Sequence, residues 1–70
     1  MNLYRDEEIL KIIADGAIFI LKIDGQREAQ NIFTVMLSGG KIPHDEFFRK
    51  DGSDITKLVD DALTNYFSYR

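Results

Sequence analysis

The fold is decided by residues 17–23, which read AIFILKI. Most of these residues are β-branched or aromatic, and the stretch lies between Gly16 and the dipeptide Asp24-Gly25. Such a composition bounded by turn residues is typical of a β-strand. A lone strand would leave backbone N–H and C=O groups unpaired, at a cost of roughly 1–3 kcal/mol for each buried group. The segment therefore needs a partner strand.

The partner is expected within residues 26–37, which allow two interpretations. Apolar residues recur there at helical spacing, at Ala29, Ile32, Phe33, Met36 and Leu37. A helix over residues 26–38 would make the protein mostly α. Residues 31–37 also alternate as a strand does, and Asp24-Gly25 is a common hairpin-turn dipeptide. Because the first strand needs a partner, we favour an antiparallel hairpin.

The register of this hairpin follows from the faces of its two strands. The heavier apolar sets are Phe19, Leu21 and Ile23 in the first strand, and Phe33, Val35 and Leu37 in the second. Both sets must face one core, and a shift of one residue inverts a strand. We therefore expect a connection of about three or five residues, or a bulge. With three, Lys22 lies opposite Glu28.

A helix is expected at the N-terminus. Asn2 is a candidate cap, acidic residues 6–8 suit the N-terminal half of a helix, and Gly16 suits its end. An apolar stripe supports this interpretation and consists of Leu3, Ile9, Leu10 and Ile13.

A second helix is expected at the C-terminus, reaching almost to Arg70. Ser53 is its candidate cap, and Asp54 lies in its first turn. Its apolar stripe consists of Ile55, Leu58, Val59, Ala62, Leu63, Tyr66 and Phe67. Before it, residues 46–50 indicate either a short third strand that turns at Asp51-Gly52 or a helical turn begun by Pro43, and we favour the strand.

These elements predict a single small α+β domain over residues 1–70. The element order is α-β-β-(β)-α, with helices packed on an antiparallel hairpin or three-stranded meander. The composition is that of a globular protein, with 44% hydrophobic and 30% charged residues.

Charge and hydropathy exclude several classes of function. The chain has nine basic and twelve acidic residues, a formal net charge of −3, and no basic cluster. Phosphate neutralisation supplies most of the affinity of nucleic-acid binders, so direct DNA or RNA binding is disfavoured. The apolar run at residues 17–21 is far shorter than the ~20 residues of a membrane span. The N-terminus lacks a signal-peptide pattern, and the chain has no cysteine. We therefore expect a cytoplasmic protein.

No motif predicts catalysis. His44 is the only histidine, and a metal or acid–base site would need partners that converge on it. Residues 38–41, SGGK, lack the longer glycine spacing of a phosphate-binding loop and are expected to form a turn. So small a domain has little room for a ligand pocket of ~300 Å³. We expect no enzyme activity, no cofactor and no metal.

Several apolar, aromatic and acidic side chains are not needed to form the core, and they indicate protein binding. If both helices pack on one face of the sheet, the other face displays an apolar patch; if the helices sandwich the sheet, no patch exists. Acidic helix residues would steer a partner, or serve as solvated faces, and spare aromatic side chains would anchor it. The candidate binding residues are Asp6, Glu7, Glu8, Ile18, Ile20, Ile32, Met36, Phe48, Asp60, Asp61 and Tyr69.

Two functions fit these expectations. The first is a small acidic protein-binding module, such as an inhibitor or adaptor of a larger macromolecular machine. In size, acidity and α-β-α arrangement the chain is similar to small phage-encoded inhibitors, including some anti-CRISPR proteins. This similarity is one of architecture, with no shared motif. The alternative is a homodimeric structural or assembly protein that pairs through the second sheet face or an open strand edge.

Overall fold

The computed structural model describes residues 5–26 and 28–69. The elements are α1 (Asp6–Ala14), β1 (Ile18–Ile23), the 3₁₀ helix η1 (Ala29–Asn31), β2 (Phe33–Ser38), β3 (Phe48–Gly52) and α2 (Ile55–Tyr66). This order confirms the predicted α+β fold with a three-stranded meander. The third strand lies later than the predicted residues 46–50, because Asp51 and Gly52, where a turn was expected, pair with Thr34 and Phe33 of β2. The mostly α alternative is wrong, because most of residues 26–38 lie outside any helix and residues 33–38 form β2.

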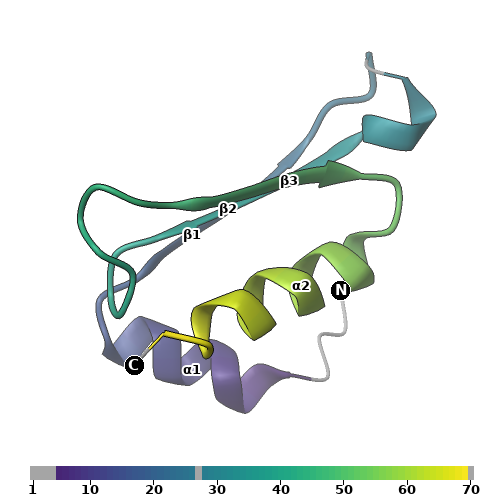
Figure 1. Ribbon diagram of the computed structural model, residues 1–70. Coiled ribbons are helices and arrows are strands. Elements are labelled where there is room, and N and C mark those ends of the chain that lie inside the picture. Colours follow the sequence, from purple (N-terminus) through teal and green to yellow (C-terminus); the bar gives the residue numbers. More distant parts are fainter. Residues whose placement is uncertain (1–4, 27, 70) are drawn as a thin grey trace.

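The three strands form one open antiparallel sheet with β2 in the centre. Both helices lie on the same side of this sheet (Figure 1). The helix α2 packs against β2 and β3, and α1 leads directly into β1. The sheet therefore has one covered face and one open face.

The strand register confirms which side chains share the covered face. Phe19 pairs with Leu37, Leu21 with Val35, and Ile23 with Phe33. The connection is longer than expected, since it spans residues 24–32, and Lys22 faces Thr34 instead of Glu28. The reason is local: η1 forms a helical turn inside the connection, and the Asp24 N–H donates to the Ile32 carbonyl at 2.9 Å.

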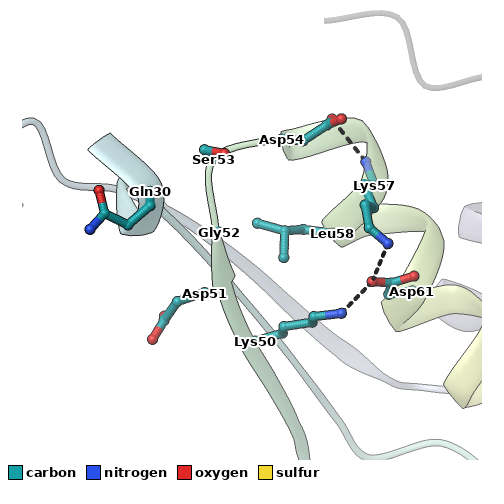
Figure 2. A pocket seen from close by; sticks show the side chains of 9 residues that line it. All are labelled: Gln30, Lys50, Asp51, Gly52, Ser53, Asp54, Lys57, Leu58 and Asp61. Carbon is teal, nitrogen blue, oxygen red and sulfur yellow. Dashed lines mark hydrogen bonds and ion pairs between the residues drawn. The ribbon is translucent and has the colours of Figure 1, made fainter. Parts of the chain in front are cut away.

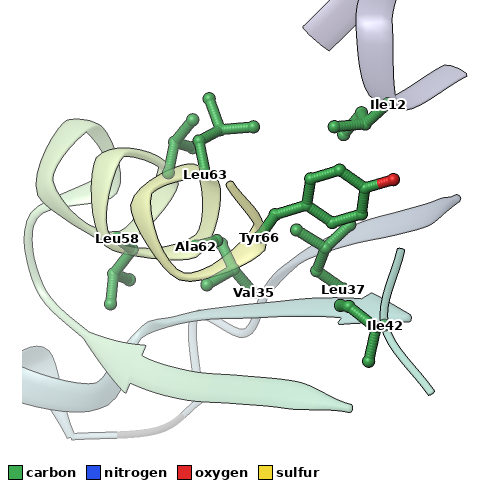
Figure 3. Close-up of a cluster of buried hydrophobic side chains, with 9 residues drawn as sticks. Ile12, Val35, Leu37, Ile42, Leu58, Ala62, Leu63 and Tyr66 are labelled. Carbon is green, nitrogen blue, oxygen red and sulfur yellow. The ribbon is translucent and has the colours of Figure 1, made fainter. Parts of the chain in front are cut away.

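The core lies between the covered face and the helices (Figure 3). From the sheet it takes Val35 and Leu37, which the central strand directs toward the helices. From α2 it takes five residues of the predicted stripe, and from α1 only Ile12 among the described residues. The fully enclosed set is Ile12, Val35, Leu37, Ile42, Leu58, Val59, Ala62, Leu63 and Tyr66. Phe19, Leu21, Phe33 and Phe48 pack around this set.

The ends of α1 illustrate how local chemistry sets its length. At its C-terminus Gly16 has a φ of +81°, and the N–H groups of Gly16 and Ala17 donate to the carbonyls of Ile13 and Ile12. This pairing is a Schellman motif and confirms the predicted role of Gly16. At its N-terminus the cap residue is Arg5. The predicted cap Asn2, and Leu3 of the predicted stripe, lie outside the described residues.

The predicted bounds of α2 need two corrections. Its N-cap is Asp54, one residue later than the predicted Ser53, and the Asp54 carboxylate accepts from the Lys57 N–H at 3.1 Å. The helix ends at Tyr66, earlier in the chain than predicted, and Arg70 lies outside the described residues. Beyond Tyr66 the N–H groups of Ser68 and Tyr69 donate to carbonyls three residues back, which tightens the chain and ends the α-helix.

Tyr66 joins three parts of the chain. Its ring is fully buried, and its hydroxyl donates to Asp15 at 2.7 Å and accepts from the Lys41 N–H at 2.9 Å. Burial of the phenol raises the pKa of Tyr66, and the carboxylate of Asp15 raises it further. The hydroxyl thus links α2 to the end of α1 and to the turn after β2.

This link predicts that Gly40→Ala destabilises the protein. A Cβ at Gly40 would lie 2.1 Å from the Tyr66 hydroxyl oxygen, and the φ of +55° is one that L-residues rarely adopt. Backbone strain and displacement of the hydroxyl together should lower the free energy of unfolding by about 2 kcal/mol or more, measured by chemical denaturation. Gly25→Ala is the control, because a Cβ there meets nothing within 4 Å. Equal effects of the two substitutions would contradict this account of the Tyr66 link.

Candidate interaction surface

The open face of the sheet is the surface that the helices leave uncovered. It presents the side chains that alternate with the core-facing ones. Its side chains form rows that run across the three strands, and the central row consists of Ile20 on β1, Met36 on β2 and Arg49 on β3. One neighbouring row pairs Ile18 with Ser38, and the other runs from Lys22 through Thr34 to Asp51. We call these eight residues the open face.

The apolar part of the open face lies on β1 and β2. Ile18 is 59% exposed and Ile20 is 49% exposed, while Met36 beside them is half-buried. Two large aliphatic side chains exposed on adjacent rows of one strand have no role in the core. Contiguous exposed apolar surface of this kind often marks an interaction site.

The polar part of the open face carries two cations and one anion. Lys22 and Arg49 are exposed. Asp51 accepts a hydrogen bond from the Thr34 hydroxyl and lies 3.6 Å from the Arg49 guanidinium. Thr34 is buried even though it belongs to this face. With two basic residues and one acidic residue, the open face has a net charge of +1, opposite in sign to the whole chain.

The acidic candidates lie on the helices, on the other side of the molecule. Arg5 binds two of them, since its guanidinium donates to both carboxylate oxygens of Glu8 and lies 2.6 Å from a carboxylate oxygen of Asp60. The same guanidinium also donates to the Asp60 carbonyl and the Thr64 hydroxyl. This contact with Arg5 lowers the pKa of Glu8. Arg5 therefore clamps α1 to α2, and we call this group the Arg5 clamp.

Asp61 is also occupied within the molecule. Its carboxylate lies 2.6 Å from the ammonium group of Lys50 on β3 and 3.9 Å from that of Lys57 on its own helix. The hydrogen bond from Lys50 lowers the pKa of Asp61. Asp6 and Glu7, in contrast, are exposed in the first turn of α1. The structure therefore uses three of the five acidic candidates to hold its own elements together.

The aromatic candidates and Ile32 lie elsewhere. Phe48 packs against the core, and Tyr69 is half-buried with its hydroxyl 3.4 Å from Glu46. Burial raises the pKa of Tyr69, and Glu46 raises it further. Ile32 lies before the start of β2, at the end of η1, and is half-buried. None of these three side chains belongs to the open face as the strand register defines it.

Sequence reasoning missed four exposed apolar residues. Leu10 and Ile13 are 65% and 62% exposed, although both were assigned to the core stripe of α1. Residues 9, 10, 12 and 13 are all apolar, and the helix turns Ile12 inward, which leaves Leu10 and Ile13 outside. Ile23 and Phe47 are 63% and 62% exposed. Ile23 lies at the end of β1, where the sheet and its loop extend beyond the helices (Figure 1).

A shallow pocket lies between η1, β3 and the start of α2 (Figure 2). Its volume is about 220 Å³, below the ~300 Å³ at which ligand pockets usually begin. The cations that line it, Lys50 and Lys57, both approach Asp61. Across residues 5–26 and 28–69, no three His, Cys, Asp or Glu side chains come together as a metal site would require.

Comparison with known proteins gives no relative. No protein-family model, no curated protein and no solved structure matches the chain. Within the part of the chain that the structure describes, neither helix has the length and apolar character needed to cross a membrane.

The Arg5 clamp predicts a pH-dependent contribution to stability. Because the folded pKa of Glu8 is lowered, this contribution is complete above its ordinary value of 4.5 and is lost as pH falls through the lowered folded value. Arg5→Met should therefore destabilise the protein most at neutral pH, and its deficit should shrink in acid. The deficit should not vanish, because the bonds from Arg5 to the Asp60 carbonyl and Thr64 do not need an ionised carboxylate.

Chemical denaturation of both proteins at a series of pH values measures this deficit. Lys22→Met is the matched control, because it removes an exposed cation from the open face without touching the Arg5 clamp. A deficit of Arg5→Met that stays constant from neutral to strongly acidic pH would contradict the clamp.

Proposed function

We propose that the protein is a non-catalytic module that binds another protein through the open face of its sheet. The observation that carries the proposal is the placement of both helices on the opposite face, which leaves Ile18 and Ile20 exposed. Burial of apolar surface contributes roughly 25 cal/mol per Å². A partner that covers these residues would gain that contribution, since no described element of this chain covers them.

The charges of the open face specify the chemistry of the partner. Lys22 lies on the β1 edge next to the row of Ile20, and Arg49 lies on the β3 edge at the end of that row. A complementary surface would be apolar opposite Ile18, Ile20 and Met36 and carry carboxylates opposite Lys22 and Arg49. Opposite charges at the rim of an interface mainly raise the association rate and select the partner.

The acidic helices have a different role in this proposal. Glu8, Asp60 and Asp61 are held by Arg5, Lys50 and Lys57. They belong to α1 and α2, which lie on the other side of the sheet from the open face. One flat partner surface would not contact both the helix layer and the open face. We therefore assign binding to the open face, and we limit a steering role to Asp6 and Glu7.

A module of this kind suits a cytoplasmic inhibitor or adaptor of a larger assembly. It has one small binding face, and it needs no cofactor for the proposed role. The open sheet face is supported by helices behind it, so it meets its partner with little loss of backbone entropy. The architectural similarity to small phage-encoded inhibitors is compatible with this class of function and does not identify the target.

The test compares two matched substitutions in affinity purification from the native host. Ile20→Glu places a charge in the open face, and Leu10→Glu places the same charge at an exposed site on α1. We expect Ile20→Glu to weaken capture of the partner by about tenfold or more, because a desolvated carboxylate replaces a buried apolar contact. Quantitative mass spectrometry reads the capture, and circular dichroism confirms that both variants fold.

The purified partner then allows a direct measurement of affinity. Calorimetry should give a tighter complex for wild type and Leu10→Glu than for Ile20→Glu. Charge reversal by Arg49→Glu should weaken the complex chiefly at low salt, where rim charges act most strongly. A partner that binds all these variants equally would exclude the open face.

A further inference from the structure

The two edges of the sheet differ in their protection. The strand order makes β1 and β3 the edges. The β3 edge reads FRKDG and is protected by charged residues, whereas β1 reads IFILKI and has one charge, at Lys22. Natural proteins usually protect exposed edges with charges, proline or a bulge, because an unprotected edge pairs with other strands. The β1 edge has little of this protection.

The backbone groups that face this open edge are identified by the register. The Asp24 N–H donates to the Ile32 carbonyl, and this pair is in register with the β1–β2 ladder. In an antiparallel ladder the residues that bond to one neighbour alternate with those that point to the other side. The even-numbered residues of β1 therefore bond to β2. The N–H and C=O groups of Phe19, Leu21 and Ile23 point to the open edge.

The neighbouring outward N–H is already used. The Ala17 N–H donates to the Ile12 carbonyl at 2.9 Å in the motif that ends α1. No hydrogen bond from another described residue reaches the outward groups of Phe19, Leu21 or Ile23. With respect to residues 5–26 and 28–69, the edge therefore offers a short run of unpaired donors and acceptors centred on Leu21.

We propose that two copies of this chain pair antiparallel through their β1 edges, about a twofold axis at Leu21, into one six-stranded sheet. An axis perpendicular to the sheet keeps both helix layers on one side and pairs each free group with its counterpart. Leu21 then faces Leu21 of the second copy, and Phe19 faces its Ile23. A register centred on Ile20 would require the Ala17 N–H, which is occupied.

This arrangement covers apolar residues that the monomer leaves exposed. Ile23 is 63% exposed on the helix side of the sheet, and it would pack beside Phe19 of the second copy. The two α1 helices would lie on the same side of the joined sheet. Leu10 and Ile13 are exposed on α1 and are the apolar residues available to them.

The size of the contact indicates a weak dimer. A stable interface buries ~800 Å² on each partner, and a paired strand of six residues is only ~20 Å long. The apolar residues of α1 add to the strand contact without making a large hydrophobic interface. The dimer should therefore appear as protein concentration rises.

Sedimentation velocity combined with amide hydrogen exchange tests the proposal on the unmodified chain. We expect the weight-average mass to rise toward that of a dimer with concentration. Over the same range the amides of Phe19, Leu21 and Ile23 should become protected. The amides of Ile20 and Lys22 should be protected throughout, because they bond to β2 in the monomer.

A pair of proline substitutions supplies the matched control. Ile23→Pro removes one outward N–H from the β1 edge in each copy, and Arg49→Pro removes one from the β3 edge, since the even-numbered residues of β3 bond to β2. Ile23→Pro should weaken self-association by roughly tenfold or more. Arg49→Pro should leave it unchanged.

Several results would overturn the proposal. These are a monomer at every concentration, a dimer in which the three amides stay unprotected, and equal weakening by both proline variants. Protection of the three amides by another protein, in a chain that does not self-associate, would assign the edge to that protein instead. Ile20→Glu leaves the backbone groups of the β1 edge in place. If this variant loses partner capture but still dimerises, partner binding through the open face and dimerisation through the β1 edge are separate properties.

Discussion

The structure depends on one constraint: its two helices must cover the same face of the sheet. The stripe on α2 packs against the core-facing residues of β2 and β3. The Tyr66 hydroxyl then ties α2 to Asp15 at the end of α1 and to Lys41 after β2. The Arg5 clamp holds the other end of α1 against α2. With both helices committed to one side, the open face is a consequence of the core and not a separate feature.

The sequence contained enough information to predict the fold, because the decisive argument concerned unpaired backbone groups. A strand at residues 17–23 requires a partner. The apolar faces of the two strands must lie on the same side, and this determines whether the connection has an odd or an even number of residues, which we call its parity. Connections of three, five or more residues in odd steps all place Phe33, Val35 and Leu37 on the same side as Phe19 and Leu21. Parity was therefore predictable, while the length was not, because it depends on the helical turn Ala29–Asn31 inside the connection.

The candidate surface was only partly predictable, for a physical reason. Alternation along a strand identifies which residues share a face, and so Ile18, Ile20 and Met36 were found together. The ion pairs were not predictable, since Arg5 and Asp60 meet only when α1 and α2 are placed side by side. The apolar excess on α1 was likewise ambiguous, because four apolar residues in five positions cannot all face one core. Long-range placement decided between Ile12 and its neighbours Leu10 and Ile13.

The open face and the β1 edge meet in a single strand, and this gives β1 two separable properties. Its even-numbered side chains, Ile18 and Ile20, project from the open face, while its odd-numbered backbone groups point along the plane of the sheet. Antiparallel pairing at the edge joins two open faces into one wider surface without covering either of them. Self-association would then extend the partner-binding surface, and two copies would present two identical sites about a twofold axis. A partner with matching symmetry would gain affinity from engaging both sites, because the second contact forms at high effective concentration.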